Sequence, residues 1–223
     1  MINLEVIETV KILIALVLAY LILASITGAF QAWIADRLGD STARNLGMMS
    51  MNPFVHIDPV SLVLMPIGFL LFKIVIALSK PVPILWNYIS KPLRWVKLTL
   101  LAVSQPMAIL LLLIFLVLLR LLFIVFVIKT GFNELLHAYQ YIFEAVVGFS
   151  VWFVPYQLLM ALTQIFIYER QKSGISINQS FMLTFLPLLG ALLLRDVSFQ
   201  LLSRFVSLVN GGLISLLKIF VTI

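Results

Sequence analysis

The sequence predicts an all-α polytopic membrane protein that forms a single integral membrane domain over residues 1–223. Of the 223 residues, 63% are hydrophobic and only 11% are charged, and the mean hydropathy is +1.16. A soluble domain is about half apolar and about a quarter charged. A core of this size cannot hide so much apolar surface from water, so lipid must act as the solvent.

Five uncharged runs of about 20 residues are long enough to cross the roughly 30 Å hydrocarbon core of a bilayer as helices. The predicted spans are residues 12–35, 98–119, 145–168, 173–194 and 205–223. Lys218 interrupts the last run, but a lysine near a helix end can extend its charge to the interface. Arg120 and Lys129 bracket an apolar extension of the second span, so that helix continues beyond the bilayer or bends.

Residues 59–79 are apolar but interrupted. Pro66 and Gly68 break the run, Lys73 lies inside it, and the uncharged part is short for a span. We expect a re-entrant hairpin that enters and leaves on one side of the membrane, with a sixth transmembrane helix as the alternative. The hairpin would belong to a membrane-interface loop, residues 36–97. The end of that loop, 79–95, contains three prolines that forbid a continuous helix.

The net charge of +6 does not indicate nucleic-acid binding, because the basic residues are scattered rather than gathered on one face. The one dense group flanks apolar runs, where positive charge meets anionic lipid headgroups. It comprises Lys80, Lys91, Arg94 and Lys97. A hairpin at 59–79 places most lysines and arginines on the side that holds residues 36–97. We therefore predict that this side is cytoplasmic and that the N-terminus is outside.

The chain contains no cysteine, which excludes disulfides, thiolate metal ligands and a cysteine nucleophile. A cleaved signal peptide is not expected, because its first region should be positive. Here Glu5 and Glu8 precede Lys11.

Four short patterns follow the first apolar run: GDSTAR at 39–44, MNPFVHIDP at 51–59, KPVP at 80–83 and QPMA at 105–108. Together they resemble the site-2 protease family of intramembrane zinc metalloproteases. The resemblance is closest to the short bacterial branch without a PDZ domain, and the best match lies within residues 1–110. Two positions of the family's GPLAN helix differ, since Gln105 and Ile109 replace its glycine and asparagine.

The resemblance fails at the metal. In the family, an HExxH helix supplies two histidine ligands one turn apart and a glutamate that activates zinc-bound water. Aligning Ala32 with the alanine after that motif places Thr27 and Gln31 at the histidines and Gly28 at the glutamate. An ungapped match of TQIFIYERQKSG, 163–174, to the family's LDG turn places Lys172 at the third ligand, an aspartate. These positions are therefore vestigial, and no metal or other cofactor is expected.

Few other residues could rebuild such a site. The resemblance implies a structural turn around His56, and we expect the same role for Asn52, Pro53 and Asp58. His137 is the only other histidine, and together with Glu134 it is interpreted as a solvated helix end.

Glu144 differs from these residues, because it is the one acid that we expect to be buried. It lies near the start of the third span, and carboxylates within a membrane are costly and often functional.

The sequence thus favours a catalytically inactive site-2 protease-like protein, or pseudoprotease, in a bacterial cytoplasmic membrane. It would bind transmembrane helices of partner proteins or form a subunit of a membrane complex, with lipid as its other contact. Prolines inside the spans support this, because broken helices leave backbone groups that neighbours must satisfy. They are Pro106, Pro155 and Pro187.

Two alternatives remain open. One is an active intramembrane metalloprotease with a displaced site, which would bind metal. The other is a small-solute transporter or channel component, which predicts polar residues that converge at mid-membrane. The candidates for such a pathway are Gln105, Gln157, Thr163, Gln164 and Asn210.

Overall fold

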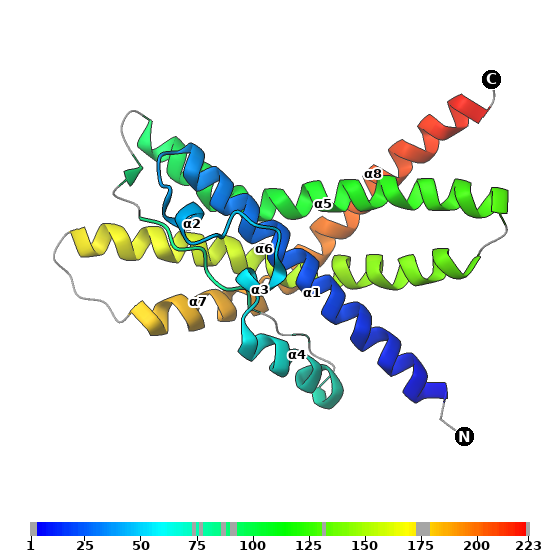
Figure 1. The fold of residues 1–223 in the computed structure, drawn as a ribbon, viewed down its shortest axis with the longest axis horizontal. Helices are drawn as coiled ribbons and strands as arrows, with labels where there is room; N and C mark the ends of the chain where they lie inside the picture. The colour runs from blue at the N-terminus through cyan, green and yellow to red at the C-terminus, as the bar shows by residue number, and fades with distance from the viewer. Residues whose placement is uncertain are drawn as a thin grey trace.

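The computed structural model describes residues 4–72, 75, 78–85, 88–89, 93–130, 133–172 and 179–221, and their regular structure is helical (Figure 1). The helices are α1 (Leu4–Arg37), α2 (Thr42–Asn45), α3 (Pro53–His56), α4 (Pro59–Phe72), α5 (Arg94–Thr130), α6 (Asn133–Lys172), α7 (Gln179–Leu193) and α8 (Arg195–Val221). Lys73 and Lys91, which the sequence analysis named, and Pro92, one of the three prolines of residues 79–95, lie outside the described residues.

Three of these helices, α1, α5 and α6, are long and apolar enough to cross a membrane. This confirms the prediction of a helical protein with membrane-spanning segments. Each helix is longer than the uncharged run that predicted it. In α5, the backbone stays helical through Arg120 as far as Thr130, so the predicted extension is a continuation of the same helix.

The helices α1 and α6 run in the same direction, and α5 runs against both (Figure 1). Residues that come later in α1 meet residues that come later in α6, in the pairs Glu8 with Tyr141, Tyr20 with Phe149, and Thr27 with Gln157. Between α5 and α6 the order is reversed, in the pairs Phe123 with Tyr139 and Arg94 with Tyr168. This is the relative direction expected if residues 59–79 do not cross the membrane.

Residues 57–80 form a hairpin whose two ends lie side by side. Ile57 and Ser79 form an antiparallel bridge, and the backbone N–H of Lys80 donates to the carbonyl of His56 at 3.0 Å. Between these ends α4 projects from the side of the bundle (Figure 1). Because Ile57 and Ser79 lie side by side, the structure favours the re-entrant hairpin over the alternative of a sixth spanning helix.

The base of the hairpin is tied to α1 by a buried tyrosine. The Tyr20 hydroxyl accepts from the backbone N–H of Asp58 and donates to the carbonyl of Leu78, both at 2.9 Å. Ser61 adds a third link, because its hydroxyl accepts from the N–H of Leu78 at 2.9 Å. Asp58 also caps α4, since its carboxylate accepts from the N–H of Ser61 and Pro59 begins the helix.

The fourth and fifth predicted spans correspond to α7 and α8. Within them, Leu186–Leu193 and Arg195–Gly212 are long and apolar enough for a span only when taken together, and they are bent by 63°. The described residues therefore hold three helices long and apolar enough to cross a membrane, or four when this pair is counted as one span, whereas the sequence predicted five. Two successive spans would require the chain to reverse direction at Arg195. In the structure the chain does not reverse there, and α8 leads away from the start of α7 (Figure 1).

The prolines inside the predicted spans do not break them. Pro106, Pro155 and Pro187 all lie inside continuous helices, α5, α6 and α7 respectively. A proline removes one N–H donor from a helix, and the flanking hydrogen bonds maintain the helix on both sides. Broken spans therefore offer no argument for a binding function.

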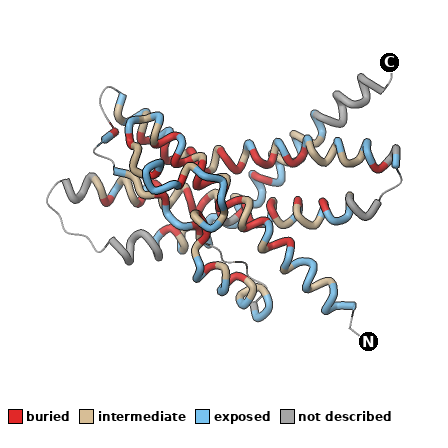
Figure 2. Tube along the Cα trace, viewed as in Figure 1, coloured by how far each residue is buried: buried red, intermediate tan, exposed pale blue. Residues whose placement is uncertain are grey.

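The core lies where α1, α5 and α6 cross, and Figure 2 shows the buried residues concentrated there. Its centre is aromatic, because Tyr20 packs against Phe149 and Phe153, with ring centroids 6.4 Å apart in each pair. Aliphatic residues of α5, including Ile109 and Leu113, complete the same cluster.

Candidate functional site

The three vestigial positions of α1 face the interior of the protein. Thr27, Gly28 and Gln31 are all buried, and each contacts a different element. Residues from α3, α5 and α6 join them to form a set that we call the polar centre. Its members are Thr27, Gly28, Gln31, His56, Gln105 and Gln157.

Hydrogen bonds connect the three long helices at this centre. The Thr27 hydroxyl donates to the carbonyl of Leu23 at 2.7 Å and accepts from the Gln157 amide nitrogen at 3.2 Å. The Gln105 amide nitrogen donates to the Gln31 amide oxygen at 2.6 Å. In an apolar surrounding these bonds between helices offset the cost of burying amides and a hydroxyl. Their groups are thus used in holding α1 to α5 and α6.

Gly28 lies directly against the imidazole ring of His56. A β-carbon built on Gly28 would lie 2.3 Å from Nδ1 of His56 and 2.9 Å from its Cε1. His56 is itself fully buried, with 0% of its surface exposed. The space that a side chain at position 28 would need is therefore filled by a histidine ring.

The His56 ring is held as a neutral imidazole. Its Nε2 lies 2.8 Å from the carbonyl oxygen of Ser50, and a carbonyl only accepts, so Nε2 carries the proton and donates. Burial lowers the pKa of His56 below its ordinary value of 6.5, and the positive charge of Lys80 lowers it further. Among the described residues, Nδ1 of His56 and Oε1 of Gln157 are buried without a hydrogen-bond partner.

The turn that carries His56 is built by two similar helix starts. Asn52 caps α3, because its side-chain oxygen accepts from the N–H of Phe54 at 3.1 Å, and Pro53 occupies the first turn. Asp58 and Pro59 repeat the arrangement at α4. An oxygen-bearing cap followed by proline is a favourable beginning for a helix, and it places His56 between two fixed points.

Asp40, in the GDSTAR pattern, has a structural role that the sequence analysis did not assign. The residue is fully buried, and its two carboxylate oxygens accept from the backbone N–H groups of Thr42 and Leu85 at 3.0 and 2.6 Å. The carboxylate thus joins the loop after α1 to the extended chain that leads toward α5. Asp40 and Leu85 are 45 residues apart in the sequence, so the sequence did not indicate that they pair.

Lys172 is not brought to the polar centre. It ends α6, whereas the α6 residue that contacts Thr27 is Gln157, which precedes Lys172 by about 22 Å of helix. Gln164 lies nearer and lines the same small cavity as Gln31 and Gln157. The missed signal was periodicity, since Gln157 and Gln164 are two helical turns apart and share a face of α6.

The described residues contain no group of three or more histidines, aspartates or glutamates that could hold a metal ion. His137 is exposed on α6, and Glu134 has a side chain outside the described part of the structure. Asp40 and Asp58 use their carboxylates to accept backbone N–H groups. The chemistry available at the polar centre is therefore hydrogen bonding by neutral groups.

Three of the five polar residues that a transport pathway would need do converge. Gln105, Gln157 and Gln164 line one cavity, but its volume is only about 10 Å³, close to the minimum that holds a single water. Thr163 instead donates to the carbonyl of Leu159 on its own helix, and Asn210 belongs to α8. The convergence thus packs the helices together and leaves little room for a solute.

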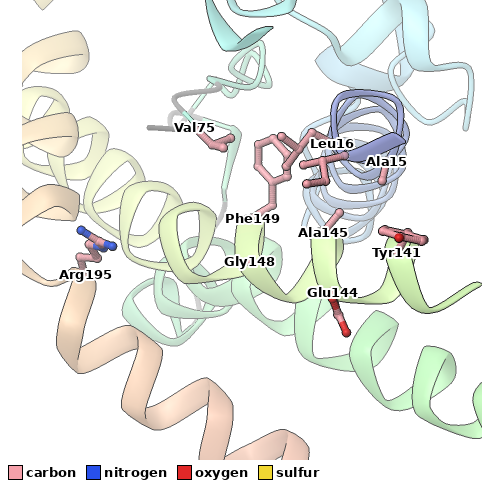
Figure 3. A pocket seen from close by; sticks show the side chains of 10 residues that line it. Ala15, Leu16, Val75, Tyr141, Glu144, Ala145, Gly148, Phe149 and Arg195 are labelled. Carbon is pink, nitrogen blue, oxygen red and sulfur yellow. The ribbon is translucent and has the colours of Figure 1, made fainter. Parts of the chain in front are cut away.

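A larger cavity of about 390 Å³ lies beside the contact between α1 and α6, closer to the N-terminal ends of both helices than the polar centre. We call it the lateral groove (Figure 3). Its walls are mostly apolar, and Figure 3 shows Leu16, Phe149 and Val75 directed toward one another inside it. The lining residues are Ile12, Ala15, Leu16, Val75, Tyr141, Glu144, Ala145, Gly148, Phe149 and Arg195. They come from α1, α6, the return arm of the hairpin and α8.

Glu144 lies at the rim of this groove, and the prediction that it is buried is wrong. The side chain is exposed, and one carboxylate oxygen accepts from the Gln140 amide at 3.0 Å. Its position in α6 directs it away from the face that packs against α1 (Figure 3). It therefore adds negative charge to the edge of a cavity whose walls are apolar.

Comparisons with protein families, with curated proteins and with solved structures find no match to this chain.

Proposed function

We propose that this chain is a catalytically inactive, site-2 protease-like membrane protein that binds transmembrane helices of partner proteins in the lateral groove, alone or as a subunit of a membrane complex. It would reside in a bacterial cytoplasmic membrane, with residues 36–97 in the cytoplasm and the N-terminus outside. The proposal has two parts, the loss of catalysis and the retention of a binding surface.

The observation that carries the first part is the contact between Gly28 and His56. A glutamate at position 28 would have to displace a buried imidazole that Ser50 holds through Nε2. Thr27 and Gln31, at the two histidine positions, are occupied with hydrogen bonds to Gln157 and Gln105. These contacts support a centre that has been repacked as part of the fold.

The lateral groove supports the second part. It is an apolar cavity of about 390 Å³ that opens beside α1 and α6, two helices that qualify as membrane spans. Without a hydrophobic driving force in lipid, helices associate through close packing and polar contacts. The groove offers both, because small residues line it and two charged residues lie at its edges.

Metal content and proteolysis test the first part. Protein purified without chelators should contain well below one equivalent of zinc and should not cleave a model transmembrane peptide. A bound equivalent of zinc, with cleavage that disappears on chelation and returns with zinc, would overturn this part and favour the displaced-site protease.

Position-specific crosslinking in native membranes tests the second part. A photoreactive amino acid at Gly148, inside the groove, should give an adduct with a membrane protein. The matched control is Gly211 on α8, because a side chain added at either glycine meets no other atom within 4 Å. Equal adducts from both positions, or none from Gly148, would contradict helix binding in the groove.

A further inference from the structure

The residues that line the lateral groove include one acid and one arginine. Glu144 lies on α6, and Arg195 lies across the groove at the start of α8 (Figure 3). Between them the walls are apolar, with Leu16, Val75 and Phe149 in contact range of any occupant. The groove can therefore discriminate between partner helices by their charge as well as by their shape.

The α6 side also allows an unusually close approach. Ala145 and Gly148 follow Glu144 on the groove face, and Ala15 faces them from α1. A β-carbon added at Gly148 would meet no atom of the described protein within 4 Å, so the space above this glycine is open. Small residues with open space above them are what a tightly packed transmembrane helix requires.

The environment of Glu144 then specifies the chemistry of the occupant. Glu144 lies at the same end of α6 as Tyr141 and Phe143, which Lys11 and Arg120 contact, and its carboxylate lies at the rim of the apolar groove. The side chain that donates a hydrogen bond to it is Gln140, a neutral amide. A lysine or arginine of a partner helix would form a charge-assisted hydrogen bond with this carboxylate, which is stronger than a hydrogen bond between neutral groups.

We propose that the groove selects a transmembrane helix that carries a lysine or arginine opposite Glu144, with a small residue about one turn away against Gly148. This inference rests on the proposed helix-binding function and names its specificity. Arg195 repels a cation from the α8 side, so the basic residue of the partner is directed to α6 and the rotation of the partner helix is fixed.

Binding of synthetic helices in neutral phosphatidylcholine vesicles tests the proposal. The probes are three Leu-Ala transmembrane peptides that are identical except for one residue near the peptide end that lies at the level of Glu144, which is Lys, Gln or Glu. The chain lacks cysteine, so Leu122→Cys on the exposed surface of α5 accepts one fluorophore for energy transfer from a labelled peptide. We expect the Lys peptide to bind about fivefold to tenfold more tightly than the Gln peptide.

Two substitutions locate the effect. Glu144→Gln should abolish the preference for the Lys peptide, whereas Glu5→Gln, at an exposed acid that does not line the groove, should leave it intact. Gly148→Leu should fill the groove and prevent binding of every peptide, whereas Gly211→Leu should not. Because the space at both glycines is open, these variants are expected to fold, and thermal unfolding checks that they do.

The outcomes separate the specificity from the proposed function. If the Lys and Gln peptides bind equally and Gly148→Leu still blocks them, the charge selection is wrong while helix binding stands. Tightest binding of the Glu peptide would assign the selection to Arg195 and also overturn this proposal. If no peptide binds, or if Gly148→Leu has no effect, both the specificity and helix binding in the groove are wrong.

Discussion

Gly28 occupies a position where the fold has no room for any other side chain. Its neighbour is the aromatic ring of His56, whose Nε2 is fixed by the Ser50 carbonyl, so the ring cannot move aside cheaply. Gly28 is thus the residue that lets α3 pack on α1. If the proposed resemblance holds, it also stands where the family carries its glutamate, and the two features would then have one structural origin.

Substituting Gly28 with alanine should destabilise the protein by about 1–3 kcal/mol, the usual cost of overpacking an interior. Unfolding in detergent, followed by heat or by denaturant titration, measures the change. The matched control is Gly148→Ala, which meets open space and should be neutral or slightly stabilising because alanine favours helix. Adding His56→Ala to Gly28→Ala should recover part of the loss, and a fully stable Gly28→Ala variant would contradict the contact.

The buried His56 should make stability depend on pH in a defined direction. Its pKa in the folded protein is below the ordinary 6.5 because of burial and then Lys80. Below pH 6.5 the unfolded chain therefore binds a proton that the folded chain does not, and unfolding becomes more favourable. Stability should be independent of this group at higher pH and should fall as the pH decreases from about 6.5 toward the folded pKa.

Thermal unfolding between pH 7.5 and 5.5 checks this dependence, and the composition of the chain provides the control. Only two histidines are present, and His137 is exposed. His56→Gln should remove most of the dependence, and His137→Gln should retain it. A slope that persists in His56→Gln would mean that another group is responsible.

Among the elements, the hairpin of residues 57–80 depends on a single hydroxyl of α1. Tyr20 joins the two arms by accepting from Asp58 and donating to Leu78, while its ring packs on Phe149 and Phe153. Because α4 otherwise projects from the bundle (Figure 1), this point fixes where the hairpin leaves the protein and how its return arm reaches the lateral groove.

Tyr20→Phe should loosen the hairpin without disturbing the aromatic core. The variant keeps the ring and loses two hydrogen bonds, which predicts a loss of about 1–2 kcal/mol. Hydrogen exchange should become faster for the amides of Asp58 and Leu78 and remain unchanged in the middle of α6. Tyr88→Phe, at an exposed position, serves as the control, and unchanged exchange at both arms in Tyr20→Phe would contradict the link.

Uncharged runs predicted α1, α5 and α6, because each helix must remain apolar over its whole membrane path. The same reasoning failed at Arg195 and Asp196, since two charges between apolar runs also occur in loops. In the structure they lie at the N-terminus of α8, where an acid in the first turn is favourable. A bend of 63° between the two helices leaves no mark in composition, so the sequence alone could not show that the chain continues from α7 into α8 without reversing.

The polar centre could be predicted in part. Thr27, Gly28 and Gln31 were identified through a motif on one helix, where the spacing of neighbouring residues fixes their common face. Gln157 was missed because the register of the distant LDG counterpart depended on an ungapped match, and sequence spacing does not limit a slip along a long helix. A contact between helices depends on tertiary packing, which one sequence does not record.

At the scale of the whole molecule, cation–aromatic contacts mark two layers. One layer contains Arg37 on Trp33 and Arg94 on Tyr168, at 5.2 and 5.1 Å. The other contains Lys11 on Tyr141 and Arg120 on Phe143, at 6.0 and 5.7 Å. At 1.5 Å per residue the layers are separated by about 39 Å of helix from Lys11 to Arg37 and from Arg94 to Arg120. The separation along α6, from Tyr141 or Phe143 to Tyr168, is about 38–41 Å.

This separation matches a membrane. The hydrocarbon core is about 30 Å thick, or about 40–45 Å with the headgroup regions, and tilted helices need extra length. Aromatic and basic residues are typical of its two interfaces. The first layer adjoins the loop of residues 36–97, and the second adjoins the end of α5, so the layers assign those segments to opposite sides.

Single-cysteine labelling in intact and permeabilised cells tests this assignment, and the natural chain contributes no background because it contains no cysteine. Met51→Cys, before α3, and Lys80→Cys, at the end of the hairpin, are exposed positions on either side of α4 in the sequence, so an impermeant maleimide should label both only after permeabilisation. Thr130→Cys, at the end of α5, should be labelled in intact cells. Leu71→Cys, near the tip of α4, should resist labelling in either case, because a re-entrant tip lies in lipid.

The pattern of these four labels distinguishes the topologies. Labelling of Met51→Cys and Lys80→Cys from opposite sides would require α4 to cross the membrane, against the bridge between Ile57 and Ser79. Labelling of Thr130→Cys from the same side as Met51→Cys would show that the two layers are not two interfaces. If Leu71→Cys reacts readily, α4 lies in water, and the lateral groove, whose wall includes the return arm at Val75, opens to solvent rather than to lipid. A transmembrane helix could not then enter the groove. The Leu71→Cys label therefore also tests whether the groove opens to lipid, as binding of a transmembrane helix requires.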